Sequence, residues 1–324
     1  MGEFKIYQLE KRFDVDPGDV HIDTAISNIL LDYRPQGFIA DQICPIVPVT
    51  KQSDRFFKIA QADKFRTTPD YRAPGTEPNY ISFDVSSDGY FCDNYALGSY
   101  LTREEIANAD AAISNRMSRS RLITDILLLN NEVRVASLVG SASNVGCSTT
   151  TGSAWGTSNA DPYLDCIGDL QAVEDGRGYR PNTVVFGKQA WRKWRESEKI
   201  QTLIFPHGGG IPTIEHAKLL LEVDKILIGG AYYNTAAQGM TMSLSKIWDD
   251  NVLYAYIAPT PSQEVPSFMY GFRWTVPGIP NMIARVFPFD EKKGRQDVHI
   301  AYYQDEKITD SGLGFLRTGV GSSQ

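Results

Sequence analysis

The spacing of apolar side chains in the first part of the chain indicates short elements separated by irregular segments. Helical spacing predicts one amphipathic helix over Val20–Leu31, and alternation predicts two strands, Phe56–Ile59 and Tyr80–Val85. Residues 63–78, between the two strands, carry alternating charges, three prolines and few aliphatic side chains. Such a segment cannot bury a core of its own. We therefore expect a long two-stranded loop that projects from the body and lies on another surface, most simply a neighbouring copy of the chain.

Residues 102–138 have the strongest helical pattern in the chain. Thr102 and Glu105 match a capping box, in which each side chain satisfies a backbone N–H of the other residue. Apolar side chains then recur at helical spacing, and no glycine or proline occurs before Gly140. The pattern predicts one continuous helix, about 55 Å long, that lies across a sheet. The uncharged stretch 140–160 that follows is rich in glycine and serine and predicts a linker.

From residue 161 the pattern alternates between short apolar runs and helical stripes. Asp161 and Pro162 are typical of a helix start. Later helices are expected around Trp191 and Trp194, which we assign to the core, and over Pro212–Glu222. The remaining predicted elements are a helical turn over Ser245–Trp248 and strands over Pro181–Gly187, Lys225–Gly229, Val252–Ile257, Phe268–Val276, Ala284–Phe289 and Val298–Tyr303. Strands alternating with helices predict a compact α/β unit, and the last two strands predict a hairpin around a charged turn.

Composition narrows the function classes. The 324 residues are 42% hydrophobic, which is typical of a globular protein and excludes wholesale disorder. The net charge of −7 argues against tight general binding of nucleic acid, because such binders use a basic surplus to displace counterions. Four separated cysteines without a Cys-x-x-Cys pair predict reduced thiols. Neither a membrane span nor a secretory signal is expected.

Few residues suggest catalysis or metal binding. The glycines after His207 lack the lysine and serine spacing of a phosphate-binding loop. Cys166 with His207 would supply the nucleophile and base of a cytosolic hydrolase, but Cys166 falls on a predicted apolar stripe and no third residue accompanies the pair. Asp249 and Asp250 alone offer too few oxygen ligands for a cation. We expect no catalytic, cofactor-binding or metal-binding residue.

Three stretches of the second part carry a resemblance to a known family. They are Asn182–Gly187 leading to Trp191, Lys225–Ile228 followed by Ala231–Ala236, and Ser245–Trp248 followed by Val252–Ile257, Pro266–Phe268 and Gly271–Phe272. With an N-terminal arm, a charged proline-bearing loop and a long helix before them, their order resembles the major capsid protein of tailed double-stranded DNA bacteriophages. Encapsulin shells share that fold.

The resemblance implies an α+β fold with five parts. These are an N-terminal arm over 1–48, an extended two-stranded loop over 49–90, a peripheral domain over 91–160 with the spine helix 102–138, a compact α/β axial domain over 161–278, and return strands over 279–324. It implies a structural protein that forms the pentamers and hexamers of an icosahedral capsid around double-stranded DNA, without sequence-specific DNA binding. An encapsulin-type compartment that encloses enzymes is the alternative.

The resemblance also implies partners and a location. The partners are copies of the chain itself, a separate scaffolding protein, a portal protein and, as a further option, a decoration protein; assembly takes place in the host cytoplasm without membrane contact. Contacts between copies are predicted from side chains of the arm, the loop and the long helix: Phe4, Leu9, Phe13, Arg55, Phe57, Lys58, Arg66, Tyr71, Arg72, Glu77, Arg116 and Arg119. Residues 1–24 hold three basic and six acidic side chains, a net charge of −3, so we expect the arm to contact a neighbour and not phosphate.

Overall fold

The computed structural model describes residues 21–22, 37–59, 63, 65–82, 84–108, 112–208, 210–237, 239–275 and 282–321. They form a mixed α+β structure that divides into two compact units. The first unit comprises residues 1–33, 94–127 and 276–302, and the second comprises 34–93, 128–275 and 303–324. Helix α5 (Ala112–Val139) and strand β14 (Arg295–Ile308) are each divided between the two units, α5 after Leu127 and β14 after Tyr302.

Strands of a six-stranded sheet organise the first unit. Strand β13 pairs antiparallel with β1 and with β14, and β5 also pairs with β14. The bounds are β1 His21–Ile22, β5 Asp93–Thr102 and β13 Ile283–Val286. Val298, Ile300 and Tyr302, at alternate positions of β14, are buried, as the two-residue period of a strand requires. The charged turn before β14 is confirmed, with Asp290 bridged to Arg295.

The helix predicted over Val20–Leu31 is wrong where the structure describes it. His21 and Ile22 form β1 and pair with Val286 and Arg285 of β13. Backbone pairing with an available strand edge overrides the helical spacing of the apolar side chains at these two positions. Residues 23–31 lie outside the described residues.

The long helical pattern forms two helices instead of one. The capping box is confirmed, because Thr102 and Glu105 each accept a hydrogen bond from the backbone N–H of the other. Helix α4 (Arg103–Ala107) nevertheless ends at Ala107, with Asn108 as its C-cap, and α5 begins at Ala112. Arg119 donates to Glu105 at 2.8 Å, although these residues would lie about 21 Å apart along one continuous helix. The continuous helix predicted over 102–138 is therefore wrong.

A five-stranded sheet organises the second unit, in the order β6–β15–β11–β7–β8. Strand β11 is antiparallel to both of its neighbours, whereas β7 runs parallel to β8 and β15 runs parallel to β6. The strands are β6 Cys147–Thr150, β7 Thr183–Gly187, β8 Lys225–Gly229, β11 Val252–Ala255 and β15 Gly314–Thr318. Three of them, β7, β8 and β11, confirm predicted strands.

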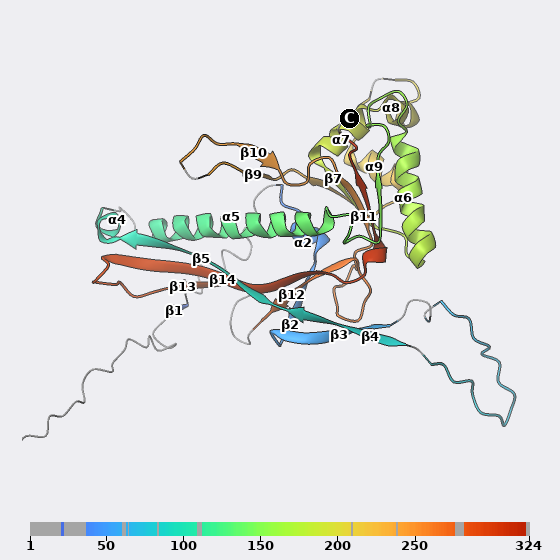
Figure 1. Cartoon of the computed structure of the whole chain (residues 1–324), viewed down its shortest axis with the longest axis horizontal. Coiled ribbons are helices and arrows are strands. Elements are labelled where there is room, and N and C mark those ends of the chain that lie inside the picture. Colours follow the sequence, from blue (N-terminus) through green and yellow to red (C-terminus); the bar gives the residue numbers. More distant parts are fainter. Residues whose placement is uncertain are drawn as a thin grey trace, which may run out of the picture. The chain divides into compact units, whose positions relative to one another are not determined.

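Helices cover one face of this sheet (Figure 1). They are α6 Pro162–Arg177, α7 Lys188–Glu196, α8 Glu198–Ile204 and α9 Ile214–Leu221. Phe186 of β7 packs here with Trp191 and Trp194, whose rings stack at a centroid distance of 5.3 Å. Val185, pointing the other way, belongs to a second cluster with the last turns of α5. Both tryptophans are core residues, as the sequence predicted.

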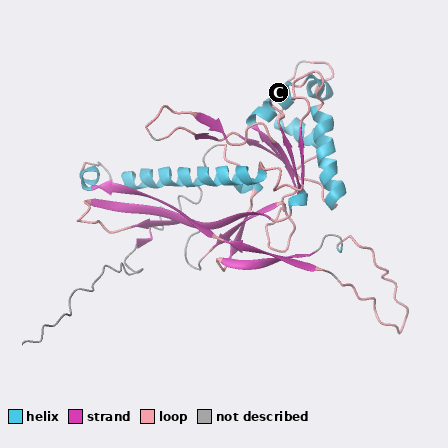
Figure 2. Cartoon of the chain, in the orientation of Figure 1, coloured by secondary structure: helices cyan, strands magenta, loops and turns pink. Residues whose placement is uncertain are grey.

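Further strands complete the second unit. Strand β12 (Met269–Trp274) pairs antiparallel with the end of β14 and parallel with β2 (Ile46–Val49), which follows the short helix α2 (Ala40–Ile43). Two ribbons form separate two-stranded sheets: β3 Ser53–Ile59 with β4 Val85–Phe91, and β9 Tyr232–Asn234 with β10 Leu244–Lys246. Figure 2 shows each ribbon as a pair of strands joined by a loop.

Local expectations for the second unit need three corrections. Ser245 and Lys246 belong to β10, so the helical turn predicted there is wrong. The strand predicted over Tyr80–Val85 begins only at Val85, because Val85 is the residue that pairs with the last residue of β3. The stretch 140–160 contains β6 and a buried Trp155, which donates to Asp165 at 2.9 Å, so it is more than a linker.

Candidate assembly surface

The ribbon β3–β4 packs one face against the rest of the second unit and exposes the other. Phe56 and Tyr90 contact the ring of Phe272, with centroid distances of 5.2 and 4.8 Å. Both side chains are buried, whereas Phe57, the next residue along β3, is 69% exposed. The alternation of side chains along a strand therefore separates those that anchor the ribbon from those that remain available to another molecule.

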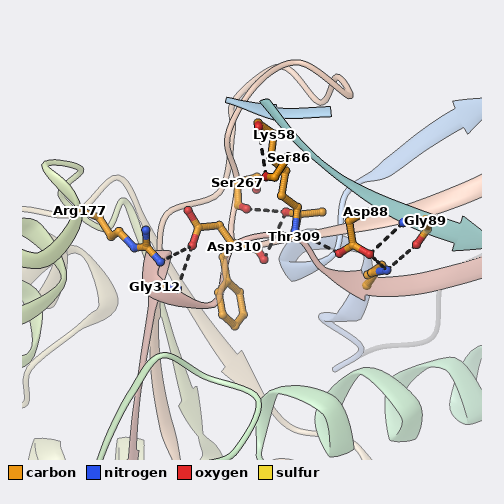
Figure 3. Close-up of polar contacts among 11 residues, drawn as sticks. Lys58, Ser86, Asp88, Gly89, Arg177, Ser267, Thr309, Asp310 and Gly312 are labelled. Carbon is orange, nitrogen blue, oxygen red and sulfur yellow. Dashed lines mark hydrogen bonds and ion pairs between the residues drawn. The ribbon is translucent and has the colours of Figure 1, made fainter. Parts of the chain in front are cut away.

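Charged groups hold the ribbon to β14 (Figure 3). Asp88 of β4 accepts hydrogen bonds from Lys58 of β3 at 3.1 Å and from Lys307 of β14 at 2.7 Å. Partial burial works to raise the pKa of Asp88, but the two lysines outweigh it and leave that pKa lowered. In the same region Arg177 pairs with Asp310 at 3.1 Å. The base of the ribbon is thus fixed by ion pairs as well as by aromatic rings.

Replacing Asp88 with asparagine is expected to loosen the ribbon at this point. The change removes a carboxylate that two lysines share, and because this side chain is partly exposed, solvent screening limits the loss to about 0.5–1 kcal/mol. Hydrogen exchange of the β3 and β4 amides should become faster. Since the pKa of Asp88 is lowered in the folded state, its contribution is present above the ordinary aspartate pKa and is lost as the pH falls through the lowered value.

Asp54 offers the matched control for this variant. It lies on the same ribbon and pairs with Lys51, but both side chains are exposed. Asp54→Asn should leave the exchange rates unchanged. Equal acceleration in the two variants would contradict the anchoring role of Asp88.

The loop between β3 and β4 is exposed over residues 65–82. Residues 65–82 contain no helix or strand, and each of them is exposed. Phe65 contacts the end of α6, where its ring lies 6.0 Å from that of Tyr179. Tyr71 and Tyr80 are 83% and 81% exposed. Exposed aromatic side chains on a segment without a core indicate a surface that another molecule covers.

The predicted contact residues of the ribbon and loop lie on this one projecting element. Arg55 and Phe57 are exposed, and Lys58 pairs with Asp88. Farther along, Tyr71 and Glu77 are exposed. Two predicted loop residues make local contacts: Arg66 pairs with Asp63 at 3.3 Å, and Arg72 donates to the carbonyl of Thr76.

The predicted contact residues of the long helix belong to the first unit. Arg119 donates to Glu105 and is partly buried. The Nε atom of Arg116 is buried and has no hydrogen-bond partner among the described residues. Phe4, Leu9 and Phe13 lie outside the described residues. Their roles in contacts between copies stay predictions.

Sequence reasoning missed the residues that anchor the ribbon. Asp88 and Lys307 are separated by 219 positions, so no local pattern joins them. One signal was available: Phe56 and Phe57 are adjacent in a strand, so one of the two had to face a core and the other solvent. Deciding which one required the partner ring of Phe272.

The residues considered for catalysis do not form a reactive group. Cys166 is fully buried, Tyr254 donates to its Sγ atom at 3.1 Å, and burial raises the pKa of the thiol to about 12. His207 is exposed on a loop. Among the described residues, no group of three His, Cys, Asp or Glu side chains is placed to hold a metal ion. Within the same residues, no helix is both long and apolar enough to cross a membrane.

Known proteins resemble this chain in sequence and in fold. No protein-family model matches it. A major capsid protein of Pseudomonas phage JBD67 is 24% identical over 72% of this chain and 77% of its own length. A phage-related protein from Bordetella bronchiseptica has a structure with a TM-score of 0.74 and 20% identity, over 93% of this chain and 98% of that one. The capsid of Myoviridae phage XM1 gives a TM-score of 0.52 and 14% identity, over 89% and 94% of the two chains.

Fold and sequence together define a structural protein of a virion capsid, and not an enzyme. The chain has the α+β fold of phage capsid proteins, and its curated relatives are phage major capsid proteins. The resemblance expected from the sequence is confirmed. The compartment-shell alternative is not favoured, because the relative from Pseudomonas phage JBD67 and a second one, from Burkholderia phage BcepMu at 24% identity over 73% of this chain, are both phage major capsid proteins. Assembly from copies of the chain itself follows from the same likeness.

Proposed function

We propose that copies of this chain assemble as pentamers and hexamers into an icosahedral shell around the double-stranded DNA of a tailed phage. In this arrangement residues 161–278 form the axial domain at the centre of each capsomer. Residues 91–160 and 279–324 form the peripheral domain, and the loop 49–90 crosses onto an adjacent copy. The arm 1–48 contacts a neighbour.

The observation that carries this proposal is the exposed loop 65–82. Ordering a backbone costs about 1–2 kcal/mol per residue, and a segment without buried apolar contacts cannot offset that cost by itself. The base of the loop is nevertheless fixed, by the rings of Phe56 and Tyr90 and by Asp88. A fixed base with an exposed, aromatic tip suits a segment that becomes covered when a second copy arrives.

Hydrogen exchange of the loop provides one test. Amides of residues 65–82 should exchange rapidly in separate subunits, because no secondary structure protects them. In assembled particles the same amides should exchange at least about tenfold more slowly, since a neighbouring copy would then bury them. Amides of β7 serve as the internal control and should be protected in both states. Equal exchange of the loop in the two states would contradict its role between copies.

Assembly without nucleic acid provides the second test. The acidic arm repels phosphate, so shells should form from the purified chain, alone or with a scaffolding protein, in the absence of DNA. Electron microscopy should show closed particles, and their yield should change little with salt. Particles that appear only when DNA or RNA is supplied, with a yield that falls steeply with salt, would contradict the proposal.

We propose a separate scaffolding protein and a portal protein as the partners of this chain in the phage, with a decoration protein as a further option. Co-purification of the chain with each candidate from infected cells tests them individually. The host cytoplasm is the proposed place of assembly.

A further inference from the structure

A cleft of about 580 Å³ opens along α7 in the second unit. Four basic side chains line it, and one carboxylate accompanies them: Lys188, Arg192, Arg195 and Lys246, with Glu196. Like charges that line one cleft repel one another, and the repulsion is larger in a cleft than in open water. An anionic occupant is therefore favoured, although the chain as a whole carries a net charge of −7.

Ion pairs within the chain neutralise little of this positive charge. Arg192 reaches Glu196 only at 4.0 Å, and its side chain is 77% exposed. Lys246 donates to the neutral amide of Gln189 at 2.6 Å. Helix α7 adds to the positive potential, because its first residue follows a glycine that supplies no side-chain cap.

The walls of the cleft are partly aromatic. Lys188 lies over the ring of Tyr232 at 5.5 Å, and Arg195 lies over that of Trp191 at 5.9 Å. The Nε atom of Arg195 is buried and has no hydrogen-bond partner among the described residues. Ile211, also in the lining, is 67% exposed. The fitting ligand thus combines carboxylates with at least one apolar side chain.

We infer that the segment Phe13–Asp19 of a second copy binds this cleft. The segment reads Phe-Asp-Val-Asp-Pro-Gly-Asp, so it carries three carboxylates and no basic group, and apolar residues alternate with its first two carboxylates. Its charge of −3 matches the +3 that four basic side chains and one carboxylate give the cleft. The segment itself lies outside the described residues, and its sequence supplies the match.

A contact of this kind joins two different surfaces of one chain. In a homo-oligomer such a heterologous contact repeats from copy to copy and closes into a ring when the rotation allows. The inference thus rests on the proposed capsomer assembly and assigns to the arm a receptor on the adjacent copy. Pro17 already restricts the backbone of the unbound segment, so the segment loses less conformational entropy on binding.

Disulfide trapping tests the contact directly. One full-length chain carries Val15→Cys, a second carries Arg192→Cys, and both carry Cys147→Ser because Cys147 is the exposed cysteine of the described residues. When the two are mixed, assembled and oxidised, a cross-linked dimer should form. Val15→Cys mixed with Lys225→Cys, an exposed position at the start of β8, is the control and should give none.

Charge reversal provides an independent readout. Lys188→Glu with Arg192→Glu should lower particle yield about tenfold, and so should Asp14→Lys with Asp16→Lys, because close charge pairs at an interface become repulsive. Combining all four substitutions should restore the yield. Lys218→Glu with Lys225→Glu, which changes the net charge by the same amount, should have little effect.

The outcomes separate this inference from the proposed function. The inference would be overturned if the mixed pair formed no disulfide. It would also be overturned if the combined charge reversal failed to restore assembly. In the last case the cleft would bind nucleic acid or an acidic segment of another protein. Absence of shells from the unmodified chain would contradict the proposed function, whereas the disulfide is scored in whatever oligomer is present.

Discussion

Replacing Arg317 with methionine is expected to destabilise the second unit by about 3–5 kcal/mol, because it leaves a buried carboxylate unpaired. Arg317 of β15 donates to Asp169 of α6 through two hydrogen bonds, at 2.6 and 2.7 Å. Asp169 is only 3% exposed. The measurement is urea unfolding followed by tryptophan fluorescence, since Trp155 and Trp194 are both buried in this unit.

Two further variants make this result specific. Lys218→Met breaks an exposed pair with Glu215 and should cost less than about 0.5 kcal/mol. Replacing both partners, Arg317→Met with Asp169→Leu, should recover most of the loss, because no charge is then buried without a partner. A single Arg317 variant as stable as the unmodified chain would show that Asp169 is not held as a buried ion pair.

Replacing Glu132 with alanine should cost the second unit a similar amount, about 3–5 kcal/mol, because three donors then lose their acceptor. Glu132 of α5 is 1% exposed and accepts from the backbone N–H groups of Ile39 and Ala40 and from the indole N–H of Trp248, the last at 2.6 Å. Ile39 caps α2 without a side-chain bond of its own, so this distant carboxylate serves as the cap. Urea unfolding again measures the effect.

The pH dependence of the free energy of unfolding separates the effect of the charge of Glu132 from the effect of its side-chain shape. Burial raises the pKa of Glu132, although hydrogen bonds from Ile39, Ala40 and Trp248 oppose the rise. A raised folded-state pKa means that the contribution of the group is fully present below the ordinary glutamate pKa and is lost as the pH rises through the raised value. Glu132→Gln keeps one acceptor oxygen but turns an amide N–H₂ group toward one of the donors, so it should cost about 1–3 kcal/mol, and it should remove this pH dependence. An unchanged pH profile in that variant would contradict the assignment.

Local sequence signals were sufficient for elements whose stabilising partners are close in the chain. The capping box at Thr102 joins residues three apart, and Asp161 caps the start of α6 by accepting from Leu164. The buried strand Thr183–Gly187 was recognised from a short apolar run that ends at a glycine. The resemblance to phage capsid proteins was carried by particular stretches in a particular order, and the likeness in fold to the capsid of Myoviridae phage XM1, at 14% identity, agrees with it.

The candidate surfaces depended on partners that no local pattern connects. The two strands of the ribbon were predicted from alternation and the loop between them from its charges and prolines. The second strand was placed too early, since it begins at Val85, which pairs with Ile59. The basic cleft was not predicted at all. Its side chains come from separate elements, with Lys188 on α7 and Lys246 on β10.

The sequence by itself determined the class of this protein: a globular α+β chain, acidic, without a catalytic constellation, and with a segment that cannot bury a core. Only the tertiary structure decided where the long helical pattern breaks, which strand register the ribbon takes, and which buried charges find partners. The physical reason is that helix spacing and capping act over three or four residues, whereas strand pairing and buried ion pairs join residues far apart in the chain. Asp169 and Arg317, 148 positions apart, meet only once the sheet has formed.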